Sequence, residues 1–492
     1  MRNAHKKINI RVVQQVILPF LLFRDIVRLV QSHFFESVTV RTISKLFCQC
    51  TSIHFESRDF LQLQNIVSVI PRLVYFSAVN FSFPEKLRFK SNMNHLQELR
   101  LKNFDSTAFL KCTSLRKLKI AQRCSENNGQ LISNNNNNLQ RLHLAQINLK
   151  KDTVQSILNC TSLIHLKLLG NEIKDKASHL LLFGLNRMTQ LKTLALQDQM
   201  QNSFASFVPS HLCLTRFSFE DDGMSKEGLV NIFVCIQEMT SLRTLKMVSP
   251  DARTCDDRIE VSLSKLTGLT RLHLQRFTFG MCFFATLQKL EHLKMHCCKF
   301  KDLYFCSALK TLHAEEVTWE QFEFFDTHQL QKLYLTYSKN ITRMERMLEA
   351  RNLTFLYLFE FDVLHQSKLF AFIEQNTRLE TLVLTHVPLG NIRDFGLKHL
   401  SMLDVSNCDL DSSCFAVLKK LRLKELAIHK NEFGLKDLVD FVEHIALYRN
   451  VSNLMFSHPR WRGDVLPILM RSNINYTVVS HLDYSIESNS KR

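Results

Sequence analysis

Apolar residues recur along most of the chain in one frame, in which the first, fourth and sixth positions are leucine or a similar side chain. The clearest copy is Leu163, Leu166 and Leu168, followed by Asn171 at the ninth position. Alternation of apolar and polar residues over the later positions predicts a short strand with one buried and one exposed face, because successive side chains of a strand point to opposite sides. The chain is therefore expected to consist of repeated units that contribute one strand each.

The frame begins at seventeen places, at intervals of 19 to 28 residues with a mean of 23.6. The starting residues are Leu73, Leu96, Leu115, Leu139, Leu163, Leu191, Leu214, Leu242, Leu269, Leu290, Leu309, Leu330, Leu353, Leu379, Leu400, Leu423 and Val451. The longer repeats carry apolar residues at three- and four-residue spacing between strands, as in residues 153–163 and 174–191, which predicts helices. The repeats of 19–21 residues have room only for a turn or a short 3₁₀ segment.

Both this period and this spacing resemble those of leucine-rich repeats, over residues 50–475 and about 17 repeats. The resemblance implies an α/β solenoid, with a curved parallel sheet on the concave side and helices and 3₁₀ turns on the convex side. Each strand then pairs its backbone groups with the strands of the neighbouring repeats. Residues 1–49 are expected to form a small N-terminal helical module, and residues 476–492 a C-terminal tail.

The N-terminal module carries its own pattern. A Leu-Pro pair is followed by apolar residues at helical spacing, and a proline in the first turn is typical of a helix start. With a second apolar series that ends in Ser44-Lys45-Leu46-Phe47, this resembles the F-box, although the linker lacks the usual acidic P-x-D-L segment. The resemblance implies docking to a Skp-type adaptor and, through it, to a cullin. The implied docking residues are Leu18, Pro19, Leu22, Ile26 and Leu29. A helical cap over the first repeat is the alternative interpretation.

Basic residues are concentrated at the exposed frame positions. The chain has a net charge of +17, and the copies from Leu96 to Leu309 hold fourteen basic residues against four acidic ones at these positions, followed by an aromatic zone. A basic sheet attracts acidic partners, and arginine binds carboxylate or phosphate with two hydrogen bonds. We therefore expect an acidic or phosphorylated protein segment on the concave face. The expected contact residues are Arg100, Arg116, Lys119, Arg141, Lys167, Arg216, Arg243, Lys246, Arg271, Tyr334, Phe355 and Tyr357. Alternatively, the basic residues only keep the solenoid soluble.

Catalytic motifs do not occur in the sequence. The chain contains no C-x-x-C pair, H-E-x-x-H motif, phosphate-binding loop or G-x-S-x-G, so we expect no catalytic residue, no metal and no cofactor. Most of the 14 cysteines fall at equivalent points of the repeats, where they fit small buried side chains; Cys298 and Cys408 occupy the ninth position. The 20 histidines are interpreted as residues of the exposed face. The five asparagines 134–138 are expected to form a disordered insertion.

The N-terminus is basic and then apolar, but Arg11 and two glutamines interrupt it, so a cleaved signal is not expected. No stretch reaches the ~18 apolar residues that a membrane span needs. We expect a cytoplasmic protein, with the nucleus as an alternative, that is not an enzyme. The favoured function is the substrate-recognition subunit of an SCF-type cullin–RING ubiquitin ligase, and the alternative is a protein-interaction scaffold without a ligase. Nucleic-acid binding is not expected, because the basic and aromatic zones are separated in sequence.

Overall fold

The computed structural model describes most of the repeat region. The described residues are 52–56, 74–79, 93–103, 109–122, 127–173, 175–198, 213–221, 226–254, 263–280, 284–324, 328–337, 350–360, 366–457, 464–472 and 474–478. The five residues implied to dock an adaptor lie outside them. The chain divides into two compact units, residues 1–239 and 240–492.

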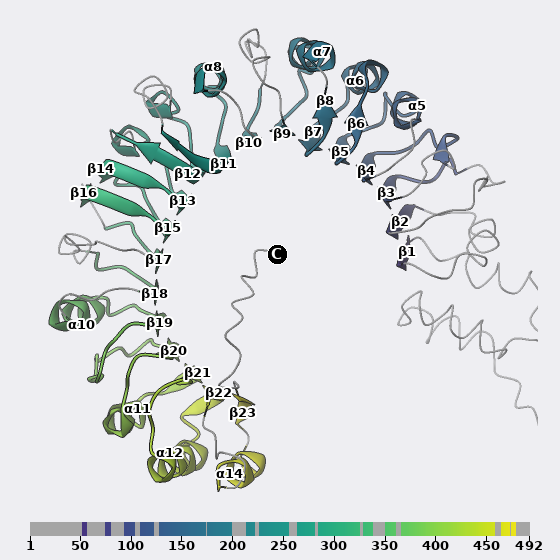
Figure 1. Ribbon diagram of the computed structural model, residues 1–492. Coiled ribbons are helices and arrows are strands. Elements are labelled where there is room, and N and C mark those ends of the chain that lie inside the picture. Colours follow the sequence, from purple (N-terminus) through teal and green to yellow (C-terminus); the bar gives the residue numbers. More distant parts are fainter. Residues whose placement is uncertain are drawn as a thin grey trace, which may run out of the picture. The chain divides into compact units, whose positions relative to one another are not determined.

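In the first unit, parallel strands follow one another in chain order, each paired with its neighbours, and helices lie on the opposite side of the repeats (Figure 1). The strands are β1 (Ser52–Glu56), β2 (Tyr75–Val79), β3 (Glu98–Lys102), β4 (Lys117–Ala121), β5 (Arg141–Ala145), β7 (His165–Leu169), β9 (Thr193–Asp198) and β10 (Arg216–Asp221). The helices are α5 (Asn128–Ser133), α6 (Lys151–Leu158), α7 (Asp175–Leu185) and α8 (Lys226–Gln237). A short pair, β6 (Asn148–Leu149) and β8 (Glu172–Ile173), connects two repeats behind the main sheet.

The second unit repeats this plan. Its main strands are β11 (Thr244–Thr254), β12 (Arg271–Phe279), β13 (His292–His296), β15 (Thr311–Glu315), β17 (Lys332–Thr336), β18 (Phe355–Phe359), β19 (Thr381–Thr385), β20 (Met402–Asp404), β21 (Leu423–Ala427), β22 (Val451–Phe456) and β23 (Asn475–Val478). Its helices are α10 (Gln366–Gln375), α11 (Phe415–Leu418), α12 (Leu435–Tyr448) and α14 (Leu466–Arg471), with 3₁₀ turns η5 (Phe284–Thr286) and η7 (Ser412–Cys414). The fold is thus an α/β leucine-rich-repeat solenoid, as predicted.

The leucine frame sets both the register and the core. Leu166 pairs with Leu142 on one side and Leu194 on the other, so equivalent leucines stack from repeat to repeat. Leu166 is 0% exposed and Leu168 is 1% exposed, which confirms that both point into the core. Strands β1 and β23 continue the same register beyond the seventeen frame copies, by pairing with β2 and β22. Among the described helices, none is long and apolar enough to cross a membrane.

The eighth frame position has the same backbone conformation in most of the described copies, usually directly after the strand. In twelve copies its backbone is left-handed, although only one of the twelve residues is glycine: Asn103, Gln122, Gln146, Gly170, Arg276, Cys297, Glu316, Tyr337, Glu360, His386, Asn407 and Lys430. This conformation costs other residues roughly 1 kcal/mol. A hydrogen bond to the next repeat offsets that cost; the Gln146 N–H, for example, donates to the Leu169 carbonyl at 3.0 Å. The eighth side chains of successive repeats therefore lie side by side at the end of the sheet.

The ninth position closes the turn with a buried donor. The Asn171 amide donates to the Leu144 carbonyl at 2.9 Å and accepts the Ile147 N–H at 3.2 Å, which joins two repeats. At the same position, the Cys298 thiol donates to the Leu274 carbonyl at 3.5 Å, and the Cys408 thiol donates to the corresponding carbonyl of the preceding repeat. Cysteine therefore replaces asparagine as the donor, which agrees with the buried role predicted for it. Every described cysteine is a free thiol.

Three of the short repeats differ from the prediction, those that begin at Leu269, Leu290 and Leu309, whereas the repeat that begins at Leu379 returns without a helix or strand, as predicted. Instead of only turns or 3₁₀ segments, the return side of these three repeats contains extended strands: the end of β12 pairs with β14 (Lys299–Phe305), and β14 pairs with β16 (Thr318–Phe324). A strand advances about 3.3 Å per residue against 1.5 Å for a helix, so few residues can span the repeat. Phenylalanines fill the space that a helix would occupy. Phe279 stacks on Phe300 at 5.3 Å and Phe284 on Phe305 at 6.3 Å.

The five asparagines at 134–138 are also structured, so the prediction of a disordered insertion is wrong. They follow α5 and bind the preceding repeat. Asn135 is 1% exposed, accepts the Leu115 N–H at 2.8 Å and donates to the Cys112 and Leu131 carbonyls. Asn138 donates from the surface to the Thr113 carbonyl at 2.9 Å. Composition alone could not indicate this role, because it depends on the carbonyls of a neighbouring repeat.

Candidate binding surface on the strand face

The third and fifth frame positions point away from the core and form two rows along the sheet, which we call the strand face. In the first unit, strand pairing aligns the fifth-position row as Arg100, Lys119, His143 and Lys167. The third-position row beside it is Glu98, Lys117, Arg141 and His165. Because strands in a sheet are about 4.8 Å apart, side chains two strands apart along a row are separated by about 10 Å.

One carboxylate neutralises the start of this surface. Glu98 accepts hydrogen bonds from Arg100 at 2.7 Å and from Lys117 at 3.1 Å. Partial burial opposes ionisation of Glu98, but these two cations outweigh it and hold the pKa of that carboxyl below its usual value. By contrast, Lys119 and Lys167 form no ion pair with another described residue. Lys119 on β4 and Lys167 on β7 therefore carry positive charge that no described acidic residue neutralises.

A histidine sits between the two unpaired lysines. His143 is half-buried, and burial together with the charges of Lys119 and Lys167 lowers its pKa to about 4. The ring is therefore neutral at pH 7. Its Nε2 atom is shielded from solvent and has no hydrogen-bond partner within the described part of the chain. On this row, two cations thus flank a neutral polar ring.

The second unit shows the same alternation and then becomes aromatic. Its fifth-position row begins with Lys246, His273, Lys294 and His313. Burial lowers the pKa of His273 to about 4, with further lowering by Lys246 and Lys294. Burial, followed by Lys294, also lowers the pKa of His313 to about 4. The row in this unit therefore also carries cations around neutral rings.

The aromatic part continues this row without a break. The ring of His313 stacks on Tyr334 with centroids 5.2 Å apart, and Tyr334 stacks on Phe355 at 4.4 Å. Tyr357 lies 6.1 Å from Tyr334. All these side chains are half-buried, so each ring keeps one part open to solvent. The basic and aromatic zones, which are separated in sequence, meet in space at the His313–Tyr334 contact.

The predicted contact residues divide between these places. Six of them are on the fifth-position rows: Arg100, Lys119, Lys167, Lys246, Tyr334 and Tyr357. Four are on the third-position rows: Arg141, Arg216, Arg271 and Phe355. Arg116 and Arg243 directly precede their strands and lie at the edge of the face. Arg243 also donates to the Gly268 carbonyl at 2.8 Å, which ties its guanidinium to the protein itself.

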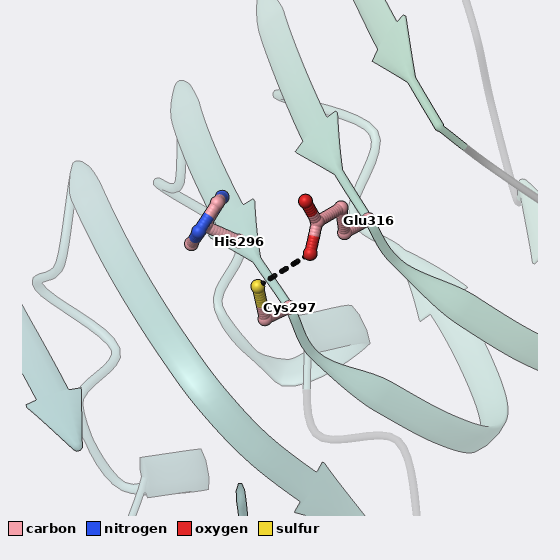
Figure 2. A group of neighbouring side chains, drawn as sticks. All are labelled: His296, Cys297 and Glu316. Atoms are coloured by element: carbon pink, nitrogen blue, oxygen red, sulfur yellow. Dashed lines mark hydrogen bonds between the residues drawn. The ribbon is translucent and has the colours of Figure 1, made fainter. Parts of the chain in front are cut away.

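A second group of side chains lies at the ends of β13 and β15. Figure 2 shows His296 and Cys297 on one strand end and Glu316 on the next. Their candidate ligand atoms all lie within 4.8 Å of one another. Motif searches along the sequence miss this group because its members belong to different repeats. Aligning the repeats by the frame would have found it, since His296-Cys297 and Glu315-Glu316 occupy the same seventh and eighth positions.

No protein-family model matches the chain, and no curated protein matches it. Solved structures with a similar fold include a leucine-rich-repeat protein of Leptospira interrogans, with 16% identity, a TM-score of 0.43 and coverage of 89% of this chain and 98% of that chain. An internalin from Listeria monocytogenes has 15% identity, a TM-score of 0.34 and coverage of 85% and 92%. The Arabidopsis receptor kinase HAESA ectodomain, solved with an IDA peptide hormone, has 15% identity, a TM-score of 0.38 and coverage of 84% and 76%. The fold assignment rests on the strand ladder of the chain itself.

Proposed function

We propose that this chain is a protein-interaction scaffold that catalyses no reaction, and that its strand faces bind an acidic or phosphorylated segment of a protein partner. The observation that carries the proposal is the fifth-position row, in which unpaired lysines flank a neutral, half-buried histidine. A carboxylate or phosphate beside either lysine would gain a charge-assisted hydrogen bond. The neutral ring of His143 could also donate a hydrogen bond from Nε2 to such an anion in the tautomer that carries the proton on Nε2.

The spacing of the row favours one conformation of the bound segment. Lys119 and Lys167 are two strands apart, or about 10 Å. A polyproline II segment has three residues per turn and rises about 3.1 Å per residue, so it presents every third side chain on one side at about 9 Å intervals. A segment that crosses the strands with an acidic residue at every third position therefore matches both lysines. A polyproline II segment whose acidic residues have another spacing can place an acidic side chain beside only one of the two lysines.

The aromatic zone of the second unit supplies the apolar part of a binding site. Tyr334 stacks on Phe355 and lies 6.1 Å from the tilted ring of Tyr357, and His313 separates this group from Lys294 on the same row. Charges accelerate association and make it sensitive to salt, whereas buried aromatic anchors lengthen the lifetime of a complex. We expect Tyr357→Ala to raise the dissociation rate of a bound aromatic, acidic segment and to leave its association rate almost unchanged.

Fluorescence anisotropy with labelled (Glu-Pro-Pro)n and (Gln-Pro-Pro)n peptides tests the proposal on the full chain. The glutamate peptide should bind more tightly than the glutamine peptide and lose affinity as salt rises. Lys119→Glu with Lys167→Glu should weaken binding of the glutamate peptide at least tenfold. The matched control is Lys151→Glu with Lys176→Glu, which changes the net charge equally at exposed positions of α6 and α7.

Three outcomes would contradict the proposal. The first is equal affinity for the two peptides, and the second is an equal loss of affinity in the two double variants. The third is tighter binding of a single-stranded RNA of equal charge, which would assign the surface to nucleic acid. A phosphoserine version of the peptide, with a phosphoserine at every third position, distinguishes carboxylate from phosphate recognition.

The more specific proposal is that this scaffold recruits substrates to an SCF-type ubiquitin ligase in the cytoplasm or the nucleus. Its support is the F-box resemblance of Leu18, Pro19, Leu22, Ile26 and Leu29, which lie outside the described residues. A ligase subunit of this kind acts by raising the effective concentration of its substrate near the enzyme. A Skp-type adaptor and a cullin would then be partners of the N-terminal module.

Co-purification tests this second proposal separately. Leu18→Ala with Pro19→Ala should abolish recovery of the adaptor and the cullin with the tagged full chain, while the thermal unfolding transition and peptide binding stay unchanged. A helical cap would behave differently, because its apolar side chains pack on the repeats. Retained adaptor, or a lowered unfolding temperature together with lost peptide binding, would contradict docking through this module.

A further inference from the structure

The strand ends of β13 and β15 bring three potential metal ligands together, His296, Cys297 and Glu316. His296 and Cys297 occupy the seventh and eighth positions of one repeat, and Glu315 and Glu316 occupy the same positions of the next. Cys297 and Glu316 both have left-handed backbones, with φ of 51° and 52°. These two residues have the same backbone conformation on neighbouring strands, and Figure 2 shows the Cys297 thiol and the Glu316 carboxylate facing each other. The fold itself therefore sets the arrangement.

The polar side-chain atoms of this group lie within hydrogen-bond or ion-pair distance of one another. Cys297 Sγ donates to Glu316 Oε2 at 2.9 Å. His296 Nδ1 is shielded from solvent and lies 3.1 Å from Glu315 Oε2, an ion-pair distance. The candidate ligand atoms of His296, Cys297 and Glu316 all lie within 4.8 Å of one another, so the three side chains are close enough to share one ion.

The donor set discriminates between metals. A thiol sulfur, an imidazole nitrogen and carboxylate oxygens are the ligands of Zn²⁺, whereas Mg²⁺ and Ca²⁺ prefer oxygen alone. Glu316 is exposed and Cys297 is half-buried, so an ion can enter from solvent.

We propose that His296, Cys297 and Glu316 bind a zinc ion at the carboxyl ends of β13 and β15. The inference is independent of the protein-binding proposal. Binding breaks the S–H bond of Cys297 and forms a metal–sulfur bond, and the proton leaves to solvent. Without metal, burial and the neighbouring Glu316 raise the pKa of the Cys297 thiol to about 12, so the free site holds a protonated thiol.

The positively charged side chain of Arg276 opposes binding of the ion. Arg276 occupies the eighth position of the preceding repeat and interacts with the Cys297 thiol, while its Nη1 donates to the Pro250 carbonyl at 2.5 Å. A guanidinium this close repels a divalent cation. We therefore expect weaker binding than at structural zinc sites, and tighter binding when Arg276 is replaced by glutamine. If these side chains only stabilised the fold, Arg276→Gln would not increase the affinity for a metal ion.

Cobalt absorption provides the test, because Co²⁺ replaces Zn²⁺ and a cobalt–thiolate bond produces a charge-transfer band. The purified full chain, stripped with a chelator and kept reduced, is titrated with Co²⁺ and then with Zn²⁺. The band should saturate at one ion per chain and disappear as Zn²⁺ is added. Cys297→Ser should abolish it, whereas Cys213→Ser, which removes an exposed thiol elsewhere, should not.

Further variants keep the test decisive if Cys297→Ser does not fold by circular dichroism. His296→Ala and Glu316→Gln should each weaken Co²⁺ binding at least tenfold, and Arg276→Gln should strengthen it by a similar factor. Absence of the band in the wild-type chain overturns the proposal. A band that persists in folded Cys297→Ser does so too, as do unchanged affinities in both ligand variants.

Discussion

Replacing Asn135 by alanine tests whether the asparagine run is a structural element. The amide of Asn135 accepts the Leu115 N–H at 2.8 Å and donates to the Cys112 and Leu131 carbonyls at 2.7 and 2.9 Å, all in a buried setting. Alanine leaves a buried N–H without a partner, and each carbonyl loses one donor. A buried group left unpaired costs about 1–3 kcal/mol. We therefore expect a loss of about 2–4 kcal/mol in local stability.

Amide hydrogen exchange is the suitable assay, because it reports on single repeats, and global unfolding of a repeat array need not be a two-state transition. The Leu115 amide should exchange roughly 30- to 1,000-fold faster in Asn135→Ala, since 1.4 kcal/mol corresponds to a factor of ten. Asn135→Asp keeps the acceptor but directs a charge at two carbonyls, so it should be at least as damaging.

Asn138→Ala is the matched control three residues away, where a single exposed hydrogen bond joins the side chain to the Thr113 carbonyl. It should change exchange at Leu115 by less than about threefold, in keeping with the small effect of most surface substitutions. Equal, small effects of Asn135→Ala and Asn138→Ala would refute the reasoning, because a disordered insertion tolerates both.

Two other predictions use residues of the same unit. Leu166→Ala should cost about 2–5 kcal/mol by urea unfolding, whereas His165→Ala, one residue away on the strand face, should stay within about 0.5 kcal/mol; equal effects would mean that the frame is misplaced there. Burial, then the charges of Lys119 and Lys167, lowers the pKa of His143 from 6.5 to about 4. Between pH 6.5 and pH 4, His143 therefore binds more protons in the unfolded chain than in the folded chain. The stability of the folded chain should consequently fall as the pH drops through this range. Allowing for partial solvation, the loss is about 1–2 kcal/mol, and folded His143→Gln with an undiminished pH slope would contradict it.

The architecture could be predicted from the sequence because one short frame encodes it. The frame position of a leucine such as Leu166 predicts its burial, the strand to which it belongs and its pairing with Leu142 and Leu194. The same frame placed Lys119, Lys167 and Tyr334 on the exposed face correctly. These assignments depend only on alternation within a strand, which is local information.

Other features depend on what a neighbouring repeat offers, and local patterns did not indicate them. Asn135 has a role only because the Leu115 N–H of another repeat lacks a backbone partner. The strands β14 and β16 form because each pairs its backbone groups with the other, although the short repeats were predicted to have room only for a turn or a 3₁₀ segment. His296 and Glu315 become neighbours only once the repeats are stacked in register.

The buried thiols allow the local opening of single repeats to be measured. Cys112, Cys160 and Cys408 are distributed over both units, and burial raises the pKa of each to about 12, so an alkylating reagent meets almost no thiolate while the repeat is closed. Each reacts only when its repeat opens to solvent, whereas the exposed Cys213 supplies the unprotected rate. Alkylation rates at these positions, read by mass spectrometry, would therefore give the free energy of opening repeat by repeat without introducing a label.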